Sequence, residues 1–295
     1  MTAGAAIQLR IEATNPGQFF ACCGLLELAD RVWSGAQAWF DSSGQTFFLR
    51  GWPETPAPPA MLLTELARCP LTNVMTAAQV ARRRELSAKP RKEREAAIES
   101  EKKGLDALYR EAPLLLGEPF ELRVDWFLDD RAGGDAFKTW AGQQSVLDIA
   151  LGMKAALEAE DWSRVPPSDW LSQSTGRDGL PFNFDANLGD VGSDLDVGFS
   201  FDPLTALKLR ELRLRTRPLI EFGAFAGLQR FRPMRVEREN RYRYCTWGQP
   251  LFPELACVAA SGFLPAVTIA TFEFRLLYRT KYLKSFLPAT ALTRS

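Results

Sequence analysis

The sequence predicts an α+β fold in which mixed sheets pack with helices, and three observations lead to this prediction. Segments in which apolar and polar residues alternate, typical of strands, lie near both ends of the 295-residue chain. Residues 15–33 are apolar on nearly every face, as in a buried helix. Residues 82–104 are highly charged with a thin apolar stripe, which is typical of a helical segment that projects into solvent.

The first predicted part, residues 1–60, has the order β-α-β-β. Its first strand is the alternating segment Ala5–Ala13. The helix begins with Asn15 as a good N-cap, a proline at the first helical position, and Gln18 where a capping-box side chain would reach back. A turn at Asp41–Gly44 between two alternating segments then predicts a hairpin.

Small side chains at Ala21–Gly24 give this helix a thin face that permits close approach of a sheet or a second helix. Such an approach accounts for a glycine that costs about 1 kcal/mol relative to alanine in a helix. The segments Phe19–Leu26 and Phe222–Gln229 share Phe, Ala, Gly and Leu at the same offsets. Two interpretations stay open: an internal β-α-β-β duplication that places both helices as equivalents on one sheet, or chance similarity between buried helices.

The second part, residues 61–160, is expected to be largely helical and contains the charged exposed segment. A strand at Pro119–Asp129 and a helix at Gln144–Glu160 complete it. The third part, residues 161–295, is an α+β basic part in which a glycine- and aspartate-rich loop leads to a basic helix. Two strands follow, at 240–247 and 268–280. The three parts are expected to form one compact unit.

Several classes of protein are excluded or disfavoured by what the chain lacks. It has no histidine, which removes Ser-His-Asp, Cys-His and imidazole acid–base catalysis. Its five cysteines show no C-x-x-C spacing, so we expect reduced, mostly buried thiols. No glycine-rich phosphate-binding motif occurs, which disfavours an ATPase. No apolar stretch reaches the roughly 20 residues that span a bilayer, and no signal peptide is evident, so a cytoplasmic protein is expected.

The glycine- and aspartate-rich loop holds the only candidate metal ligands. Carboxylate oxygens suit hard cations such as magnesium or calcium. Their spacing matches no EF-hand, so an ordinary turn cluster is favoured and neither a metal nor a cofactor is predicted. A carboxylate-based metal nuclease stays open as a minor alternative. The four residues are Asp185, Asp190, Asp194 and Asp196.

Charge is distributed unevenly along the chain, although 36 basic and 36 acidic residues cancel overall. Residues 1–203 contain 20 basic and 30 acidic residues, a net charge of −10, and residues 204–295 contain 16 and 6, a net charge of +10. Such asymmetry points to nucleic acid or to an acidic partner. The alternative is that the two parts attract each other inside one fold.

Basic and aromatic residues are interleaved in the last third of the chain. Alternation in a strand directs Arg241 and Arg243 to one face and Tyr242 and Tyr244 to the other, so one face could meet phosphates while the other joins the core. Arginine suits phosphate because its planar fork donates two parallel hydrogen bonds. The alternative is a solvated or self-paired basic face. The candidate contacts are Arg230, Arg232, Arg235, Arg241, Arg243, Arg279, Lys281 and Lys284.

The segment "FKTWAGQQS", Phe137–Ser145, is a second candidate contact. Lys138 could bind a phosphate, Trp140 could stack on a base, and Gln143 and Gln144 could bond to base edges. The alternative is a capped helix start with Trp140 in the core.

Six segments together resemble one protein family: "TNPGQFFACCGLLELADRVW", "FKTWAGQQS", "LPFNFDAN…DVGFSFDPL", "IEFGAFAGLQRFRP", "RYCTWGQPLFPELA" and "YRTKYLKSF". The chain resembles the third family of Csb-type proteins, encoded in type I-U (also called I-G) CRISPR loci. The resemblance extends from Asn15 to Phe286 and is least characteristic at residues 82–104.

The resemblance implies a compact counterpart of the large subunit of the RNA-guided surveillance complex, Cascade. Such a noncatalytic subunit would bind crRNA and target double-stranded DNA, contact other Cas subunits, help to recognise the protospacer-adjacent motif and support recruitment of a separate helicase-nuclease. An architectural subunit whose basic part docks on an acidic neighbouring protein is the alternative.

Overall fold

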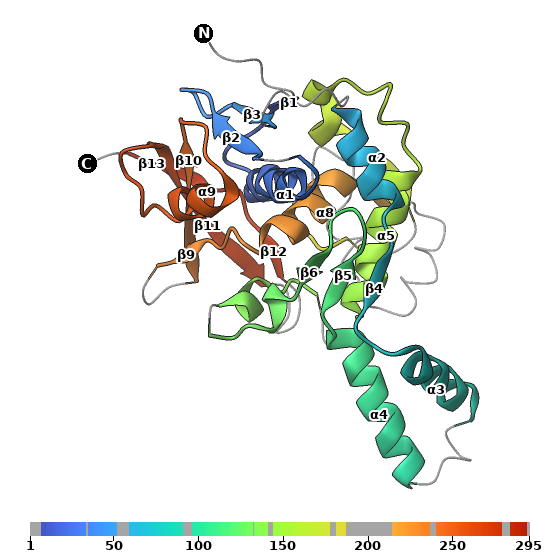
Figure 1. Cartoon of the computed structure of the whole chain (residues 1–295). Coiled ribbons are helices and arrows are strands. Elements are labelled where there is room, and N and C mark those ends of the chain that lie inside the picture. Colours follow the sequence, from blue (N-terminus) through green and yellow to red (C-terminus); the bar gives the residue numbers. More distant parts are fainter. Residues whose placement is uncertain are drawn as a thin grey trace.

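Two helices, α1 (Pro16–Val32) and α8 (Pro218–Gly227), lie side by side at the centre of the molecule, with sheets and further helices around them (Figure 1). This α+β arrangement confirms the predicted fold class. The computed structural model describes residues 7–33, 35–51, 59–90, 96–131, 133–140, 144–177, 181–186, 214–236, 240–278 and 284–293.

Antiparallel pairing joins the described strands into sheets. The N-terminal sheet has the order β1-β3-β2 and comprises β1 (Ile7–Arg10), β2 (Gln37–Phe40) and β3 (Thr46–Arg50). A second sheet comprises β4 (Leu71–Asn73), β5 (Leu114–Leu116) and β6 (Leu122–Val124). A third pairs β7 (Thr175–Arg177) with β8 (Leu214–Thr216). The C-terminal sheet comprises β9 (Met234–Arg235), β10 (Arg241–Trp247), β11 (Thr268–Tyr278), β12 (Lys284–Phe286) and β13 (Thr290–Leu292).

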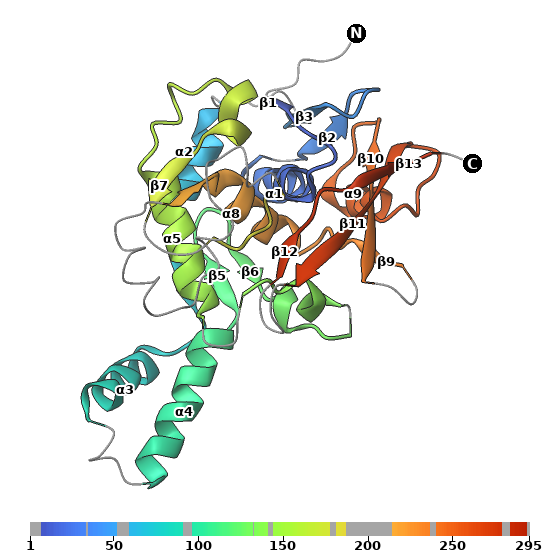
Figure 2. The ribbon, with the colours of Figure 1, turned by 180° about the vertical axis from the view of Figure 1, so that it is seen from behind.

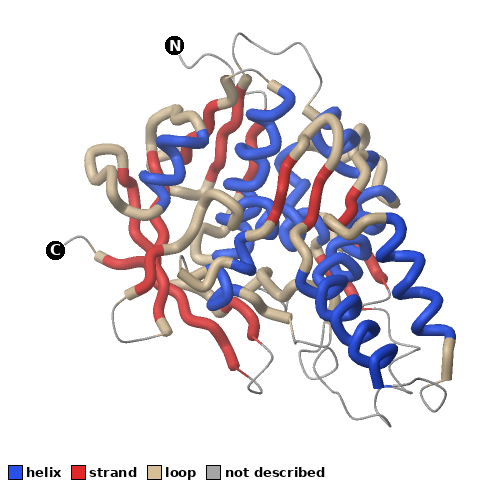
Figure 3. Tube along the Cα trace, turned by 60° about the horizontal axis from the view of Figure 1, so that its bottom comes forward, coloured by secondary structure: helices blue, strands red, loops and turns tan. Residues whose placement is uncertain are grey.

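The C-terminal sheet and most of the outer helices lie on opposite sides of the α1–α8 pair (Figures 1 and 3). The other α-helices of the described residues are α2 (Ala60–Arg68), α3 (Ala77–Ala88), α4 (Ala96–Glu111), α5 (Val146–Glu158) and α9 (Pro253–Ala260). Short 3₁₀ turns in the same ranges are η2 (Trp126–Leu128), η3 (Gly134–Phe137) and η4 (Pro167–Ser172).

The start of α1 follows from its first residues, as predicted. The Asn15 side chain accepts a hydrogen bond from the backbone N–H of Gln18, and Pro16 occupies the first helical position. The Gln18 side chain accepts from the N–H of Glu12, at 2.8 Å, and not from the N–H of the cap residue. The Gln18 side chain is not needed at the N–H of Asn15, because that N–H already donates to the carbonyl of Glu12.

Glycines set the distance between α1 and α8. A Cβ on Gly24 would lie 2.0 Å from the carbonyl oxygen of Gly223, and a Cβ on Gly227 would lie 2.2 Å from the carbonyl oxygen of Phe20. The obstructing atoms are backbone, which cannot rotate away. The thin face at Ala21–Gly24 therefore serves a helix, one of its two predicted uses.

The strand pairing differs around the two similar helices. β1, which precedes α1, pairs with β3, whereas β8, which precedes α8, pairs with β7. The helices contact each other directly and do not lie as equivalents on one sheet. Both need small residues at the same contact, which accounts for their similarity without a repeated strand arrangement.

Aromatic side chains join α1 to the C-terminal sheet. The ring of Phe19 stacks on that of Tyr244 with centroids 4.4 Å apart. The Tyr244 hydroxyl donates to the carbonyl of Ala13 at 2.7 Å, and Trp247 Nε1 donates to the carbonyl of Ala38 at 2.8 Å. One hydrophobic cluster extends through all three predicted parts of the chain.

The charged segment forms a helical hairpin of α3 and α4 that projects from the body in both views (Figures 1 and 2). Leu86 is the buried residue of α3, and α4 has none. Ion pairs join the helices, Arg82 to Glu101 at the surface and the partly buried Arg83 to Asp106, each at 2.8 Å. This confirms a charged projecting helical segment.

Three short strands differ from the predictions. β4 and β5 interrupt the region expected to be helical. β8 occupies the end of the predicted basic helix. Most of that predicted helix lies outside the described residues. Each strand has only three residues, too few for alternation to be recognised in the sequence.

Replacing Gly24 by alanine should destabilise the protein by about 3 kcal/mol, because the new methyl group meets the backbone of α8. Gly104→Ala is the matched control: this helical glycine has nothing within 4 Å of an added Cβ, so alanine should stabilise by about 0.5 to 1 kcal/mol. Urea denaturation of both variants measures these changes. A Gly24→Ala variant with the same free energy of unfolding as the wild type would contradict the close contact between α1 and α8.

Candidate nucleic-acid interface

The solvent face of the C-terminal sheet carries a group of arginines. Arg241 and Arg243 of β10 are partly exposed, whereas Tyr242 and Tyr244 are buried. This confirms the predicted alternation. The strand register places Arg275 opposite Arg241 and Glu273 opposite Arg243, and directly opposed residues share a face of the sheet. Arg241, Arg243, Glu273 and Arg275 are called the arginine face below.

A single carboxylate lies between two of these arginines. Arg241 Nη1 donates to Oε1 of Glu273 at 2.8 Å, and Arg243 Nε donates to Oε2 at 2.9 Å. Burial raises the pKa of Glu273, but the hydrogen bonds from Arg243 and Arg241 outweigh that effect and hold it below its ordinary value. Two guanidinium groups thus donate to one carboxylate, and the register places a third arginine, Arg275, on the same face.

The other C-terminal candidates are only partly described. Arg235 lies on β9, is exposed, and is opposite Tyr242 in the register. Lys284 opens β12, where only its backbone is described. Arg279 and Lys281 lie outside the described residues.

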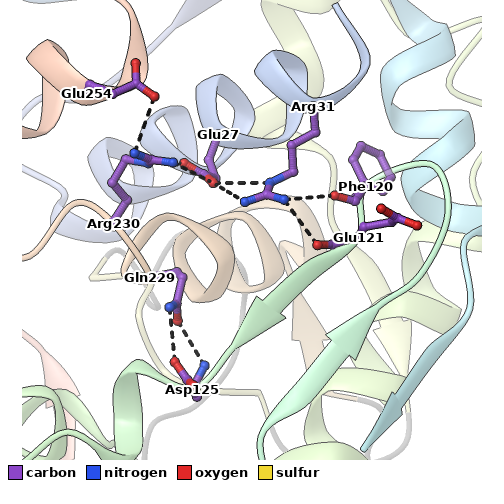
Figure 4. Close-up of polar contacts among 8 residues, drawn as sticks. All are labelled: Glu27, Arg31, Phe120, Glu121, Asp125, Gln229, Arg230 and Glu254. Atoms are coloured by element: carbon purple, nitrogen blue, oxygen red, sulfur yellow. Dashed lines mark hydrogen bonds and ion pairs between the residues drawn. The ribbon is translucent and has the colours of Figure 1, made fainter.

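Arg230 has an internal role at the end of the α1–α8 pair (Figure 4). Its guanidinium donates to Glu27, whose side chain is only 3% exposed and also pairs with Arg31 at 3.0 Å. A longer ion pair of 3.5 Å joins Arg230 to Glu254. Arg230 therefore balances a buried acid of the N-terminal part.

Arg232 and Lys138 are likewise joined to acids of the chain. Arg232 Nη1 lies 3.0 Å from Oδ2 of Asp129, and Lys138 Nζ donates to both carboxylate oxygens of Glu111 at 2.7 and 2.6 Å. The Arg232 pair corresponds to the alternative in which the basic and acidic parts attract each other within one fold, whereas Lys138 and Glu111 both belong to residues 1–203.

Trp140 is in the core, contrary to its proposed role as a base-stacking side chain. It is 4% exposed, and its ring lies 5.4 Å from those of Phe127 and Phe182, between centroids. Both faces of an aromatic side chain in such a cluster are occupied by protein. Gln144 is half-buried just before α5, and Gln143 lies outside the described residues.

Asp185, a candidate metal ligand, belongs to a buried polar network. It accepts hydrogen bonds from Arg217, at 2.8 Å from Nη2, and from Asn15 Nδ2 at 2.8 Å. Its own N–H and that of Phe184 donate to Glu221 at 3.1 and 3.2 Å. The described residues contain no group of three potential metal ligands; Asp190, Asp194 and Asp196 lie outside them.

This network was not predicted from the sequence. Its members come from three places along the chain, and only Arg217 and Glu221, at the start of α8, are related by a local spacing. The signals that could have indicated it are the N-cap amide of Asn15 and the charge of Glu221 within an otherwise apolar segment.

Comparisons with protein-family models, curated sequences and solved structures found no significant match. Within the described part of the chain, no helix is both long and apolar enough to span a membrane.

Glu221 should make stability depend on pH. Burial, and secondly the charge of Asp185, raise its pKa to about 7 from an ordinary value of 4.5. A raised folded-state pKa means that the folded protein binds the proton more tightly than the unfolded chain, so stability rises as pH falls through 7. We expect the free energy of unfolding to increase by about 2 kcal/mol between pH 8 and pH 5.5.

Urea denaturation at both pH values tests this expectation. Glu221→Gln should lose most of the increase and retain the smaller part due to Asp30, whose pKa is also raised, chiefly by burial. Glu158→Gln, at an exposed position of α5, should behave as the wild type. If the Glu221→Gln variant and the wild type gain the same stability between pH 8 and pH 5.5, Glu221 is not the group responsible.

Proposed function

We propose that the chain is a noncatalytic subunit of a type I CRISPR RNA-guided surveillance complex, and that the arginine face contacts the sugar–phosphate backbone of crRNA or target DNA. The observation that carries the nucleic-acid contact is a sheet surface that holds three arginines and one glutamate, with two of the arginines donating to the glutamate. The resemblance of six sequence segments to the Csb-type family supplies the kind of complex. The histidine-free composition agrees with a noncatalytic role.

The ion pairs with Glu273 favour phosphate binding because they hold guanidinium groups in place before any ligand arrives. Arg243 uses Nε for Glu273, at 2.9 Å, and this leaves its Nη groups to donate to a phosphate oxygen. A side chain that is already ordered loses less conformational entropy on binding. Arg275 adds an exposed charge to the same face.

Backbone contacts of this kind position a subunit and do not read sequence. In an RNA-guided complex the guide reads the target by base pairing, while protein contacts the backbone and a short duplex motif. The proposal therefore includes help in recognising the protospacer-adjacent motif, contacts with other Cas subunits, and support for recruiting a helicase-nuclease. It also includes a cytoplasmic location.

A second candidate function is architectural. Arg230 and Arg232 are both paired with acids of the same chain, so part of the positive charge of the C-terminal part is used internally. In this alternative the remaining basic surface docks on an acidic neighbouring subunit and touches no nucleic acid.

Charge reversal distinguishes the two functions. Co-expression with the neighbouring subunits and crRNA, followed by purification, should yield complexes with either wild-type chain or the Arg241→Glu/Arg243→Glu variant. We expect the variant complex to bind target DNA at least tenfold more weakly. The slope of log affinity against log salt concentration should also become less steep by about two, since two phosphate contacts are lost.

Two further variants test whether the effect depends on the charge of the arginine face. Arg164→Glu, at an arginine that is 86% exposed far from the sheet, should bind as the wild type. Glu273→Gln should bind DNA more tightly, because the repulsion between Glu273 and phosphate exceeds the gain from the arginines that its ion pairs order. If charge reversal reduces assembly but the complexes that do form retain full DNA and crRNA binding, the architectural function is correct. A wild-type chain that neither joins the complex nor binds DNA would refute both.

A further inference from the structure

Helix α9 and the residues that flank it form an exposed apolar surface. Its four members are Phe252, Leu255, Val258 and Phe263, which are 41%, 50%, 37% and 68% exposed. We call them the α9 surface. Isolated exposed apolar residues are ordinary, but several on one element mark an interaction site.

The helix period explains the composition of the two faces of α9. Phe252, Leu255 and Val258 are three residues apart and form one row along the helix. Small residues, Ala256 and Ala259, are buried on the opposite face, where α9 packs on β10 and α1. The small buried face brings α9 close to the core, and the large apolar side chains remain outside.

The end of α9 fixes the fourth member of this surface. Gly262 has φ of +81°, its N–H donates to the carbonyl of Ala259 at 2.9 Å, and the N–H of Phe263 donates to the carbonyl of Val258 at 3.1 Å. These two bonds and the left-handed glycine are a Schellman motif, which normally brings the residue after the glycine against the third-last helical residue. The most exposed aromatic residue of the surface is thus held by backbone hydrogen bonds next to Val258. A rigid apolar surface needs little ordering when it binds.

Acidic groups border the first turn of α9. Glu254 is 64% exposed and lies 3.5 Å from Arg230, which also pairs with Glu27. The pKa of the nearby Asp30 is raised, first by burial and then by the negative charges of Glu254 and Glu27. Two arginines, Arg230 and Arg31, thus lie among three carboxylates, and this border is negative.

We infer that the α9 surface binds an amphipathic protein segment that has large apolar side chains on one face and a lysine or arginine beside them. The apolar face would cover Leu255, Val258 and the two phenylalanines, and the basic side chain would neutralise Glu254 and Asp30. A second copy of this chain fits less well, because it would bring two negative borders together. The inference is independent of the proposed function and concerns a different surface from the arginine face.

Two synthetic helical peptides test the inference on the isolated chain. They share one face of leucines and differ only in carrying lysines or glutamates beside it. Fluorescence anisotropy should show that the lysine peptide binds the wild-type chain at least tenfold more tightly than the glutamate peptide. Leu255→Asp and Phe263→Ser should each weaken lysine-peptide binding about tenfold or more. Glu254→Lys should reduce the ratio between the affinities for the lysine peptide and the glutamate peptide.

The substituted side chains are exposed, so all variants should retain the wild-type midpoint of thermal unfolding. Leu151→Asp, at a leucine of α5 that is 41% exposed, is the matched control and should leave peptide binding unchanged. Equal binding of both peptides, or lysine-peptide binding that survives both Leu255→Asp and Phe263→Ser, would overturn the inference. So would a concentration-dependent dimer in sedimentation that Leu255→Asp abolishes, because the occupant would then be a second copy.

Discussion

The contact between α1 and α8 is the constraint on which the rest of the structure depends. Glycines on both helices bring backbone against backbone, and this close pair leaves room for aromatic layers on either side. Phe19 and Phe20 reach the C-terminal sheet from α1, while Phe225 of α8 meets the cluster around Trp126 and Trp140. Interiors are packed to crystal-like density, so a wider spacing here would open both layers.

The opposite charges of the two parts of the chain have two uses. Some basic side chains neutralise buried or half-buried acids, as Arg230 does for Glu27 and Arg217 for Asp185. These pairs act between segments far apart in the sequence and fix how the segments meet. Others remain on the arginine face, where Arg241 and Arg243 share the carboxylate of Glu273. The uneven charge of the chain therefore serves partly to form ion pairs inside the fold and partly to place arginines on the surface.

Local patterns predicted the elements well because their causes are local. Asn15 and Pro16 start α1, and alternation separates Arg241 and Arg243 from Tyr242 and Tyr244. The position of Trp140 depends on Phe182 and Phe225, which lie far along the chain, so the sequence left its exposure undecided. Lys138 finds its partner, Glu111, within the same acidic part of the chain, whereas the partner of Arg230, Glu27, is equally remote. Opposite net charges predicted that such pairs could exist, but pairing geometry is a property of the folded chain.

The α1–α8 contact also has a consequence for synthesis. Gly24 and Gly223 are separated by most of the chain, so α1 leaves the ribosome long before its partner exists. At ordinary elongation rates the delay is on the order of 10 to 40 s. Throughout it, a helix with fourteen residues destined for burial lacks the partner against which its glycine face packs. The core cannot close until the last quarter of the protein has been made, and the newly made N-terminal helix needs protection from aggregation until then.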